Sequence, residues 1–332
     1  MFVVTVFTLL AVYFAYRLLR SFLYPKKLIT DVSHKYVLIT GCDSGFGRVT
    51  AVHLDGLGVH VIACCLTEKG AENLRNECSE RLRALLLDVT SSVNVQDVYE
   101  TVKRIVPPNI GLWGLVNNAG TLDVGPIEWL PLSSYKHVAD VNLWGVIDVT
   151  KAFLPLVQQA HGRVVNVSSI TGRFCPKFLS AYAISKYGIE AFSDALRREM
   201  RPFGVKVSIV EPEGFKTNIA TGFLDRVKQH WKNLSEELKA VYGERFLNRA
   251  LEIWDPKNAH KQVCPDLSPV VNAITDGLLS YSPQTRYVVG GFGCHVILAV
   301  ASLPGSIADW CFRLIFSRMD GAPPEPEICK QK

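Results

Sequence analysis

Short apolar segments alternate with helical segments between residues 36 and 217, and this alternation limits the possible folds more than any other feature. The expected strands are residues 36–40, 59–64, 82–87, 112–116, 162–168, 205–210 and, later, 286–289. Strands that alternate with helices form βαβ units and a parallel sheet with helices on both faces. The sequence therefore predicts an α/β protein with a doubly wound, Rossmann-type parallel sheet.

A glycine-rich turn, GCDSGFG, follows the first predicted strand. The glycines at 41, 45 and 47 would let the backbone approach a pyrophosphate at the positive end of the next helix. Their G-x-x-x-G-x-G spacing differs from the commoner G-x-G-x-x-G fingerprint, and such glycines can also be purely structural. Ligands of open parallel sheets bind at the carboxyl ends of the strands. Three further polar residues fall at that edge: Asn117, Ser169 and Thr217.

Tyr182 and Lys186 lie four residues apart in the amphipathic helix predicted for residues 180–200, so they share one helix face. A cation beside a phenol favours the phenolate, and proton abstraction from an alcohol needs a base poised near the working pH. Alone, such a pair is more often an accident of helix periodicity. Asn142 lies in the apolar helical stretch 134–160, where it is either a structural hydrogen-bonding group or part of a site.

Charge and cysteine content exclude several classes of function. The 332-residue chain has a net charge of only +5 and no block of like charges, so no nucleic-acid partner is expected. Its nine cysteines include no C-x-x-C pair, which argues against a zinc site, and no metal site is expected. Cysteines inside apolar runs are best interpreted as small buried hydrophobic residues.

The amino terminus predicts an uncleaved membrane anchor. Residues 1–24 are apolar up to Tyr16 and then carry Arg17 and Arg20, the reverse of a signal peptide. The length is marginal for a spanning helix, which needs about 20 residues. Positive charge after the apolar stretch favours a cytoplasmic domain, and a lumenal placement stays open. The alternative, an N-terminal core helix, conflicts with the proline and two lysines in the linker 25–35.

The rest of the chain divides into one large domain and two terminal segments. Residues 36–290 would form the domain, with a helical lid at about 218–265, where the strand alternation stops. Residues 291–320 are apolar and would either dip into the membrane or cover a pocket mouth. Residues 321–332 form a polar, proline-rich tail.

Taken together, the motifs resemble the short-chain dehydrogenase/reductase family. They are Thr40-Gly41-x-x-x-Gly45-x-Gly47, Asn117-Asn118-Ala119-Gly120, Asn142, Ser169 and Tyr182-x-x-x-Lys186. The segments ITGCDSGFG, GLWGLVNNAG and YAISKYGIEAFSDALRREM are similar to the membrane-anchored retinol and hydroxysteroid dehydrogenase branch, to which 3-hydroxybutyrate dehydrogenases are related. The N-terminal anchor favours a retinol or steroid enzyme.

The resemblance implies a catalytic tetrad of Asn142, Ser169, Tyr182 and Lys186. Tyr182 would be the general acid/base, and Lys186 would lower its pKa and bind the nicotinamide ribose. Ser169 would bind and polarise the substrate oxygen, and Asn142 would hold a water in a proton relay. Ser168 is the alternative serine, but the family's spacing to the tyrosine favours Ser169.

The resemblance also implies a nicotinamide cofactor. Its binding residues would be Gly41, Ser44, Gly45, Phe46, Gly47, Asp88, Asn117, Ala119, Gly120, Tyr182, Lys186 and Thr217. NAD is favoured over NADP because no cation follows the second strand until Lys69, although the usual aspartate at the strand end is missing. One departure is Glu213, which stands where the family has glycine.

The expected function is reversible oxidation of a retinol or hydroxysteroid at the endoplasmic reticulum membrane, with the catalytic domain in the cytosol. A homodimer is possible through the helices that carry Asn142 and Tyr182, as in other family members. One alternative is a 3-hydroxybutyrate dehydrogenase, which would need a cation such as Arg173 or Lys177 in its pocket. Another is a catalytically weak, membrane-bound scaffold that binds lipid.

Overall fold

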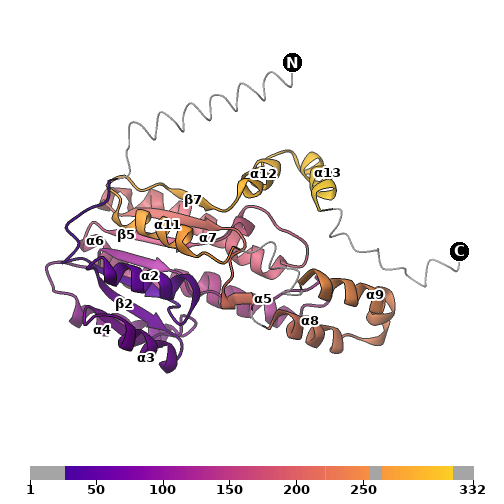
Figure 1. The fold of residues 1–332 in the computed structure, drawn as a ribbon, viewed down its shortest axis with the longest axis horizontal. Helices are drawn as coiled ribbons and strands as arrows, with labels where there is room; N and C mark the ends of the chain where they lie inside the picture. The colour runs from indigo at the N-terminus through magenta and orange to yellow at the C-terminus, as the bar shows by residue number, and fades with distance from the viewer. Residues whose placement is uncertain (1–26, 221, 255–263, 317–332) are drawn as a thin grey trace, which may run out of the picture.

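The computed structural model describes residues 27–220, 222–254 and 264–316. Seven parallel strands form one sheet in the order β3-β2-β1-β4-β5-β6-β7 (Figure 1). The strands are β1 (Tyr36–Thr40), β2 (His60–Cys65), β3 (Leu82–Leu86), β4 (Gly114–Asn117), β5 (Arg163–Val167), β6 (Lys206–Pro212) and β7 (Arg286–Val289). The predicted doubly wound parallel sheet is confirmed.

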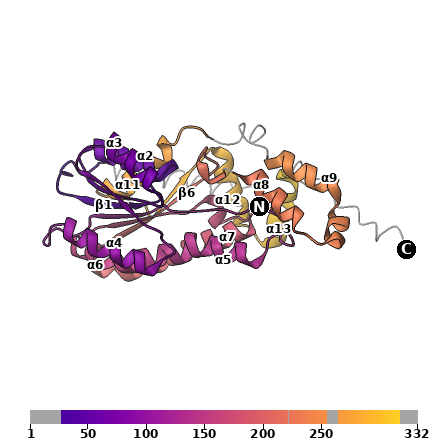
Figure 2. The same cartoon turned by 90° about the horizontal axis from the view of Figure 1, so that it is seen from below.

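Helices cover both faces of this sheet. They are α2 (Gly45–Gly56), α3 (Glu68–Glu77), α4 (Ser92–Ile105), α5 (Leu132–Ala139), α6 (Gly145–Gln159), α7 (Ser180–Met200), α8 (Phe223–Lys232), α9 (Glu236–Trp254), α11 (Ser268–Leu279), α12 (Phe292–Ala301) and α13 (Gly305–Ile315). Figure 2 shows α2, α3 and α11 on one face, and α4, α6 and α7 on the other.

The central strands are buried on both faces, which explains their continuous apolar sequence. Val37 and Ile39 of β1 pack in the cluster that contains Leu54 of α2. Leu38, between them, points to the opposite face and packs in the cluster that contains Phe153 of α6. Successive side chains of a strand point to opposite faces, so each face of β1 receives its own apolar set.

A crevice forms where the chain leaves adjacent strands β1 and β4 in opposite directions, since β1 leads to β2 and β4 leads to β5. Thr40 at the end of β1 ties the two together: its Oγ1 accepts hydrogen bonds from the N–H groups of Asn118 and Ala119, both at 3.0 Å. Gly41 has φ +70°, and a Cβ there would lie 2.7 Å from the Cα of Ala119. This close approach requires glycine.

Helices α8 and α9 extend beyond the carboxyl ends of the strands (Figure 1). They are held by aromatic contacts to Trp129, whose ring centroid lies 5.1 Å from that of Trp231 and 5.4 Å from that of Tyr242. Gly243, with φ 72°, introduces a kink in α9. The aromatic residues Trp231, Tyr242 and Phe246 of the segment predicted as a lid are thus part of the core of this helical extension.

After β7 the chain forms α12 and α13, which pack on the segment that follows β5. Cys294 and Leu298 of α12 form a buried cluster with Ile170. Large apolar side chains are exposed on these two helices and on the turn between them: Phe292, Val296, Leu303, Ile307, Trp310 and Leu314.

The first described residues run beside the end of α11. The N–H of Ile29 donates to the carbonyl of Leu279 at 2.7 Å, and that of Tyr281 to the carbonyl of Lys27 at 3.0 Å. Among the residues that the structure describes, no helix combines the length and apolarity that crossing a membrane requires. The predicted anchor at 1–24 and the tail at 321–332 lie outside these residues.

Candidate active site

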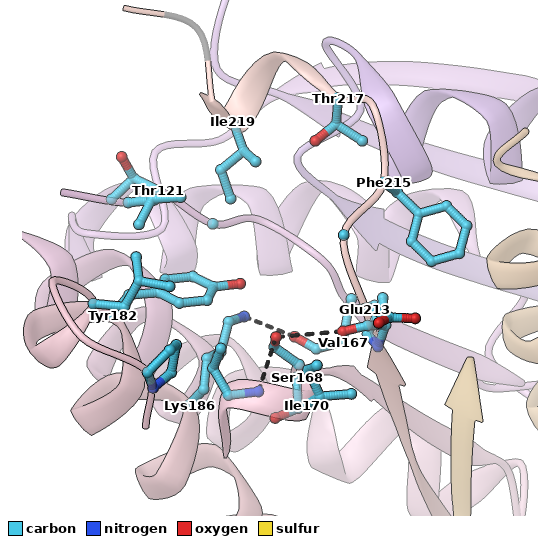
Figure 3. A pocket seen from close by; sticks show the side chains of 18 of the residues that line it. Thr121, Val167, Ser168, Ile170, Tyr182, Lys186, Glu213, Phe215, Thr217 and Ile219 are labelled. Carbon is cyan, nitrogen blue, oxygen red and sulfur yellow. Dashed lines mark hydrogen bonds between the residues drawn. The ribbon is translucent and has the colours of Figure 1, made fainter. Parts of the chain in front are cut away.

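A cavity of about 1540 Å³ lies at the carboxyl ends of the strands. Most of the residues that the sequence proposed for the site line it: Gly41, Ser44, Gly45, Phe46, Asp88, Ala119, Gly120, Ser169, Tyr182, Lys186 and Thr217. Figure 3 shows the side chains of Tyr182 and Lys186 directed into the same space, with Thr217 across from them. Residues separated by more than 170 positions in the sequence therefore meet at one edge of the sheet.

Ser169 lies directly after β5 and caps a short 3-10 turn. Its Oγ accepts a hydrogen bond from the N–H of Thr171 at 3.2 Å and donates to the carbonyl of Pro212 at 3.3 Å. A hydrogen bond with Ser169 also lowers the pKa of Tyr182, but burial outweighs it and raises that pKa to about 12. The phenol is therefore protonated at neutral pH, the form that can donate a proton to the oxygen of a carbonyl compound as it is reduced.

Lys186 is buried one helical turn after Tyr182. Its Nζ donates a hydrogen bond to the carbonyl of Val167 at 2.9 Å and lies 5.5 Å from the centroid of the Tyr182 ring. Burial lowers the pKa of Lys186 to about 8, against an opposing effect of the Glu190 carboxylate. Against burial, a hydrogen bond with Ser169 lowers the pKa of Tyr182 in this structure. The further lowering expected from the Lys186 ammonium stays a prediction.

Asn142 lies in a π-helical turn, Asp140–Trp144, between α5 and α6. Its side chain is fully buried: Oδ1 accepts from the N–H of Thr121 at 2.8 Å, and Nδ2 donates to Ser185 Oγ at 3.0 Å. A Cβ on Gly120 would lie 3.5 Å from Asn142 Oδ1 and 4.0 Å from Lys186 Nζ. Asn142 therefore lies close to Gly120 and Lys186 without lining the cavity, and its relay water stays a prediction.

Asn117 does not face the cavity, which corrects its assignment to cofactor binding. Its Nδ2 donates to Thr150 Oγ1 at 2.9 Å and to Asn166 Oδ1 at 2.8 Å, in the buried layer between β4, β5 and α6. The next residue, Asn118, lines the cavity, and its amide donates to the carbonyl of Gly41 at 3.0 Å. Neighbouring side chains on an extended chain point to opposite sides, so only one of the two asparagines reaches the crevice.

Gly47 also lies behind the cavity wall. A Cβ at this position would collide with the carbonyl oxygen of Gly41 and the side-chain amide of Asn118. The glycine is thus required for packing α2 against the turn, and direct contact with a cofactor is not its role here.

The turn before α2 fits the pyrophosphate of a dinucleotide. Gly41 and Gly45 both have positive φ, at +70° and +60°. Ser44 precedes the helix, and the first turn of α2 contains no acidic residue. Backbone N–H groups at a helix amino terminus attract anions, and the first helical turn of α2 holds no carboxylate that would compete for them.

Asp43 is a site residue that the sequence analysis missed. Its carboxylate accepts hydrogen bonds from the N–H groups of Leu66 at 2.7 Å and Thr67 at 2.9 Å, directly after β2. It also lines the cavity. The carboxylate that the sequence lacked at the end of the second strand is therefore supplied from the glycine-rich turn, which no pattern in β2 itself could reveal.

Glu213, where the family has glycine, serves a structural purpose. Its carboxylate accepts a hydrogen bond from the N–H of Gly291 at 2.9 Å, at the amino terminus of α12. Its own N–H donates to the carbonyl of Val289 at 2.9 Å. A carboxylate at a helix amino terminus is stabilising, so Glu213 fastens α12 to the end of β6.

Apolar side chains form the opposite part of the cavity. They are Leu122, Phe174, Phe178, Leu179, Ile219, Phe223, Ile297, Phe312, Ile315 and Phe316. Phe174 contacts the rings of Phe312 and Phe316 at centroid distances of 4.5 and 5.6 Å, which places α13 in the wall. Phe178 adopts φ 70°, a strained conformation for a bulky residue and one that marks functional sites.

A family model and the most similar proteins of known name are all dehydrogenases. A family model described as short chain dehydrogenase matches residues 35–228. Retinol dehydrogenase 7 of Rattus norvegicus is 45% identical over 304 residues, which cover 91% of this chain and 94% of the relative. The 17-beta-hydroxysteroid dehydrogenase type 6 of Homo sapiens is 44% identical over 288 residues, or 86% and 90% of the two chains.

A solved structure is also similar. A short-chain dehydrogenase from Streptomyces avermitilis superposes with a TM-score of 0.65 and 26% sequence identity, and the match covers 87% of this chain and 98% of that chain.

The two adjacent serines provide a matched test of the site. Ser169→Ala removes the hydroxyl beside Tyr182, so turnover of an alcohol should fall by roughly 10²–10³-fold, the usual cost of losing a donor to developing charge. Ser168→Ala should have a much smaller effect, and initial rates of NADH formation measure both. A larger loss with Ser168→Ala would reassign the catalytic serine.

Proposed function

The chain belongs to the short-chain dehydrogenase family, and on that premise we propose that it oxidises a lipophilic alcohol, a retinol or a hydroxysteroid, with NAD. It is an oxidoreductase of the alcohol dehydrogenase type that uses a nicotinamide cofactor. The observation that carries the proposal is the position of Tyr182, which lies between the glycine-rich turn and an apolar wall. An alcohol held against that wall would present its hydroxyl to the phenol.

The residues of the chain supply binding and proton transfer. When bound, the cofactor supplies the hydride acceptor. Ser169 holds the substrate oxygen by a hydrogen bond, and Tyr182 takes the hydroxyl proton during oxidation or returns it during reduction. The buried ammonium of Lys186 places positive charge beneath the phenol and favours the phenolate that oxidation requires.

The apolar wall favours a lipid-like substrate over a small hydroxy acid. Two of the most similar relatives carry retinol and hydroxysteroid in their names. A carboxylate such as that of 3-hydroxybutyrate would need a cation, and the sequence offered Arg173 and Lys177. Arg173 instead faces the carboxylate of Glu211, with 3.5 Å between Nη1 and Oε2, so Lys177 alone of the two lines the cavity.

Asp43 supports NAD over NADP. Its carboxylate lies at the end of β2, where the adenosine ribose of a dinucleotide is expected. A 2′-phosphate would meet like charge there, which costs several kcal/mol in close contacts.

A membrane location is part of the proposal. Residues 1–24 are apolar, and α12 and α13 expose large apolar side chains that also suit a membrane surface. We place the enzyme at the endoplasmic reticulum membrane, with its catalytic domain in the cytosol. A homodimer stays a prediction, and exposed Trp144 and Ile184 on the two helices concerned would suit such a contact.

The substrate class is tested by a panel assay. Membranes containing the full chain are incubated with all-trans-retinol, a 3α-hydroxysteroid, estradiol and 3-hydroxybutyrate, each with NAD and with NADP, and NADH or NADPH is recorded. We expect turnover of a retinoid or steroid with NAD. Turnover of 3-hydroxybutyrate alone would contradict the proposal. Bound NADH without turnover of any substrate would favour the lipid-binding scaffold.

Cofactor preference is tested by Asp43→Asn, which removes the charge and retains an acceptor for one of the two N–H groups. The ratio of kcat/KM for NADP to that for NAD should rise at least roughly tenfold, because like-charge repulsion is relieved. Glu68→Gln is the control, since it removes a nearby charge that pairs with Arg75 on the surface. An equal shift in both variants would show that Asp43 does not set the preference.

A further inference from the structure

Two buried carboxylates belong to α7, the helix of the catalytic lysine, and to the strand β6 that packs against it. Glu190 follows Lys186 by four residues on α7 and therefore lies on the same helix face, one turn away. It is 7% exposed, and Glu211, near the end of β6, is 0% exposed. Carboxylates this deeply buried need cationic partners, and neither was marked by any motif in the sequence.

One guanidinium joins the two carboxylates. Arg286, the first residue of β7, donates through Nη1 to Glu190 Oε2 and, at 2.7 Å, to Glu211 Oε1. Its Nη2 donates to Asp194 Oδ1 at 2.9 Å. The second carboxylate oxygen of Glu211 faces Arg173 Nη1 at 3.5 Å. Asp194 and Arg173 are each about one third exposed, so they form the rim of the cluster.

Three carboxylates of this cluster face three guanidinium groups. Glu190, Glu211 and Asp194 pair with Arg286, Arg173 and Arg197, the last of which lies 2.8 Å from Asp194 Oδ1. The ammonium of Lys186 is a further positive charge, and Glu190 is the carboxylate that shares its helix face, one turn away. Removing one partner from a buried ionic group is strongly unfavourable, so the carboxylates and the ammonium stabilise one another.

We propose that Glu190 is the counterion that keeps the ammonium of Lys186 protonated, with Arg286 and Glu211 fixing the position of its carboxylate. The inference goes beyond the catalytic tetrad and rests on the role of Lys186 in the dehydrogenase reaction. Glu190 acts through Lys186, so it is a positioning residue. Lys186 lines the cavity, whereas Glu190 is not among the residues that line it.

The electrostatics give the sign of the effect. Burial lowers the pKa of Lys186, and the Glu190 carboxylate opposes this shift, so that the pKa is about 8 with both effects present. Burial and Glu211 raise the pKa of Glu190, whereas Ser168 and Arg286 favour its charged form. Alkaline pH, where Lys186 loses its proton, also favours the carboxylate. Without Glu190, the lysine should therefore lose its charge at lower pH.

The charged and titratable groups around the pair come from every element packed against it. They are Tyr182, Asp194 and Arg197 on α7, Glu211 on β6, Glu213 after β6, Arg286 on β7, Arg173 after β5 and Cys294 on α12. Only Glu190 both contacts Arg286 and lies one helical turn from Lys186 on the same face. The contribution of Glu190 can therefore be separated from that of the cluster as a whole.

The test compares Glu190→Gln with Asp194→Asn in the full chain. Both remove one carboxylate bonded to Arg286, but only Glu190 lies next to Lys186. The alkaline limb of the pH profile of kcat/KM for alcohol oxidation should move to lower pH by roughly one unit in Glu190→Gln, the size expected for losing a nearby charge. Asp194→Asn should leave the limb in place.

Two further measurements keep the outcome decisive. The pH dependence of NADH binding, followed by fluorescence, reports the charge of Lys186 without any substrate, so absence of turnover would count against the proposed function alone. If Glu190→Gln does not fold, Glu190→Asp is the second variant. It retains the charge, so the alkaline limb of its pH profile should lie close to that of the unmodified protein. An equal loss at every pH, or an equal shift in Asp194→Asn, would show that Glu190 is merely structural and overturn the proposal.

Discussion

The parallel pairing of all seven strands is the constraint on which the rest of the structure depends. It brings the carboxyl end of every strand to one edge of the sheet. Residues from motifs that are distant in the sequence therefore meet there because of the sheet topology. Parallel pairing also buries both faces, which leaves the strand ends as the place where polar side chains can reach solvent or ligand. The divergence of the chain after β1 and β4 then opens the crevice at this edge.

Burial of Tyr182 and Lys186 gives the site its chemistry. Burial opposes the charged form of each residue and is the main reason that their pKa values move apart, to about 12 for Tyr182 and about 8 for Lys186. Neither group could work near neutral pH if its surroundings were wholly apolar. Ser169 on one side and the Glu190 cluster on the other supply the hydrogen bond and the charge that counter burial. The catalytic pair is therefore the cavity-facing edge of a larger buried network.

Much of this architecture follows from the sequence, because the alternation of strands and helices, the spacing of the glycines and the Tyr182/Lys186 pair are local signals. The sheet and the glycine-rich turn were predicted on that basis. The resemblance to a known family added further site residues, and most of the residues predicted for the site line the cavity. Asn117 was misassigned because a motif gives the position of two neighbouring asparagines but not which one faces inward. Asp43, Glu190 and the Glu213 cap on α12 were missed because each acts on a segment that is distant in sequence or unmarked by any motif.

The central claim is that the hydroxyl of Tyr182 transfers the proton in a dehydrogenase site that also binds the cofactor. Tyr182→Phe tests it most directly, because the ring and its packing are retained and only the hydroxyl is lost. The account predicts that NADH still binds, by fluorescence titration, while alcohol oxidation falls to background. Retained turnover in this variant, with normal NADH binding, would contradict the account.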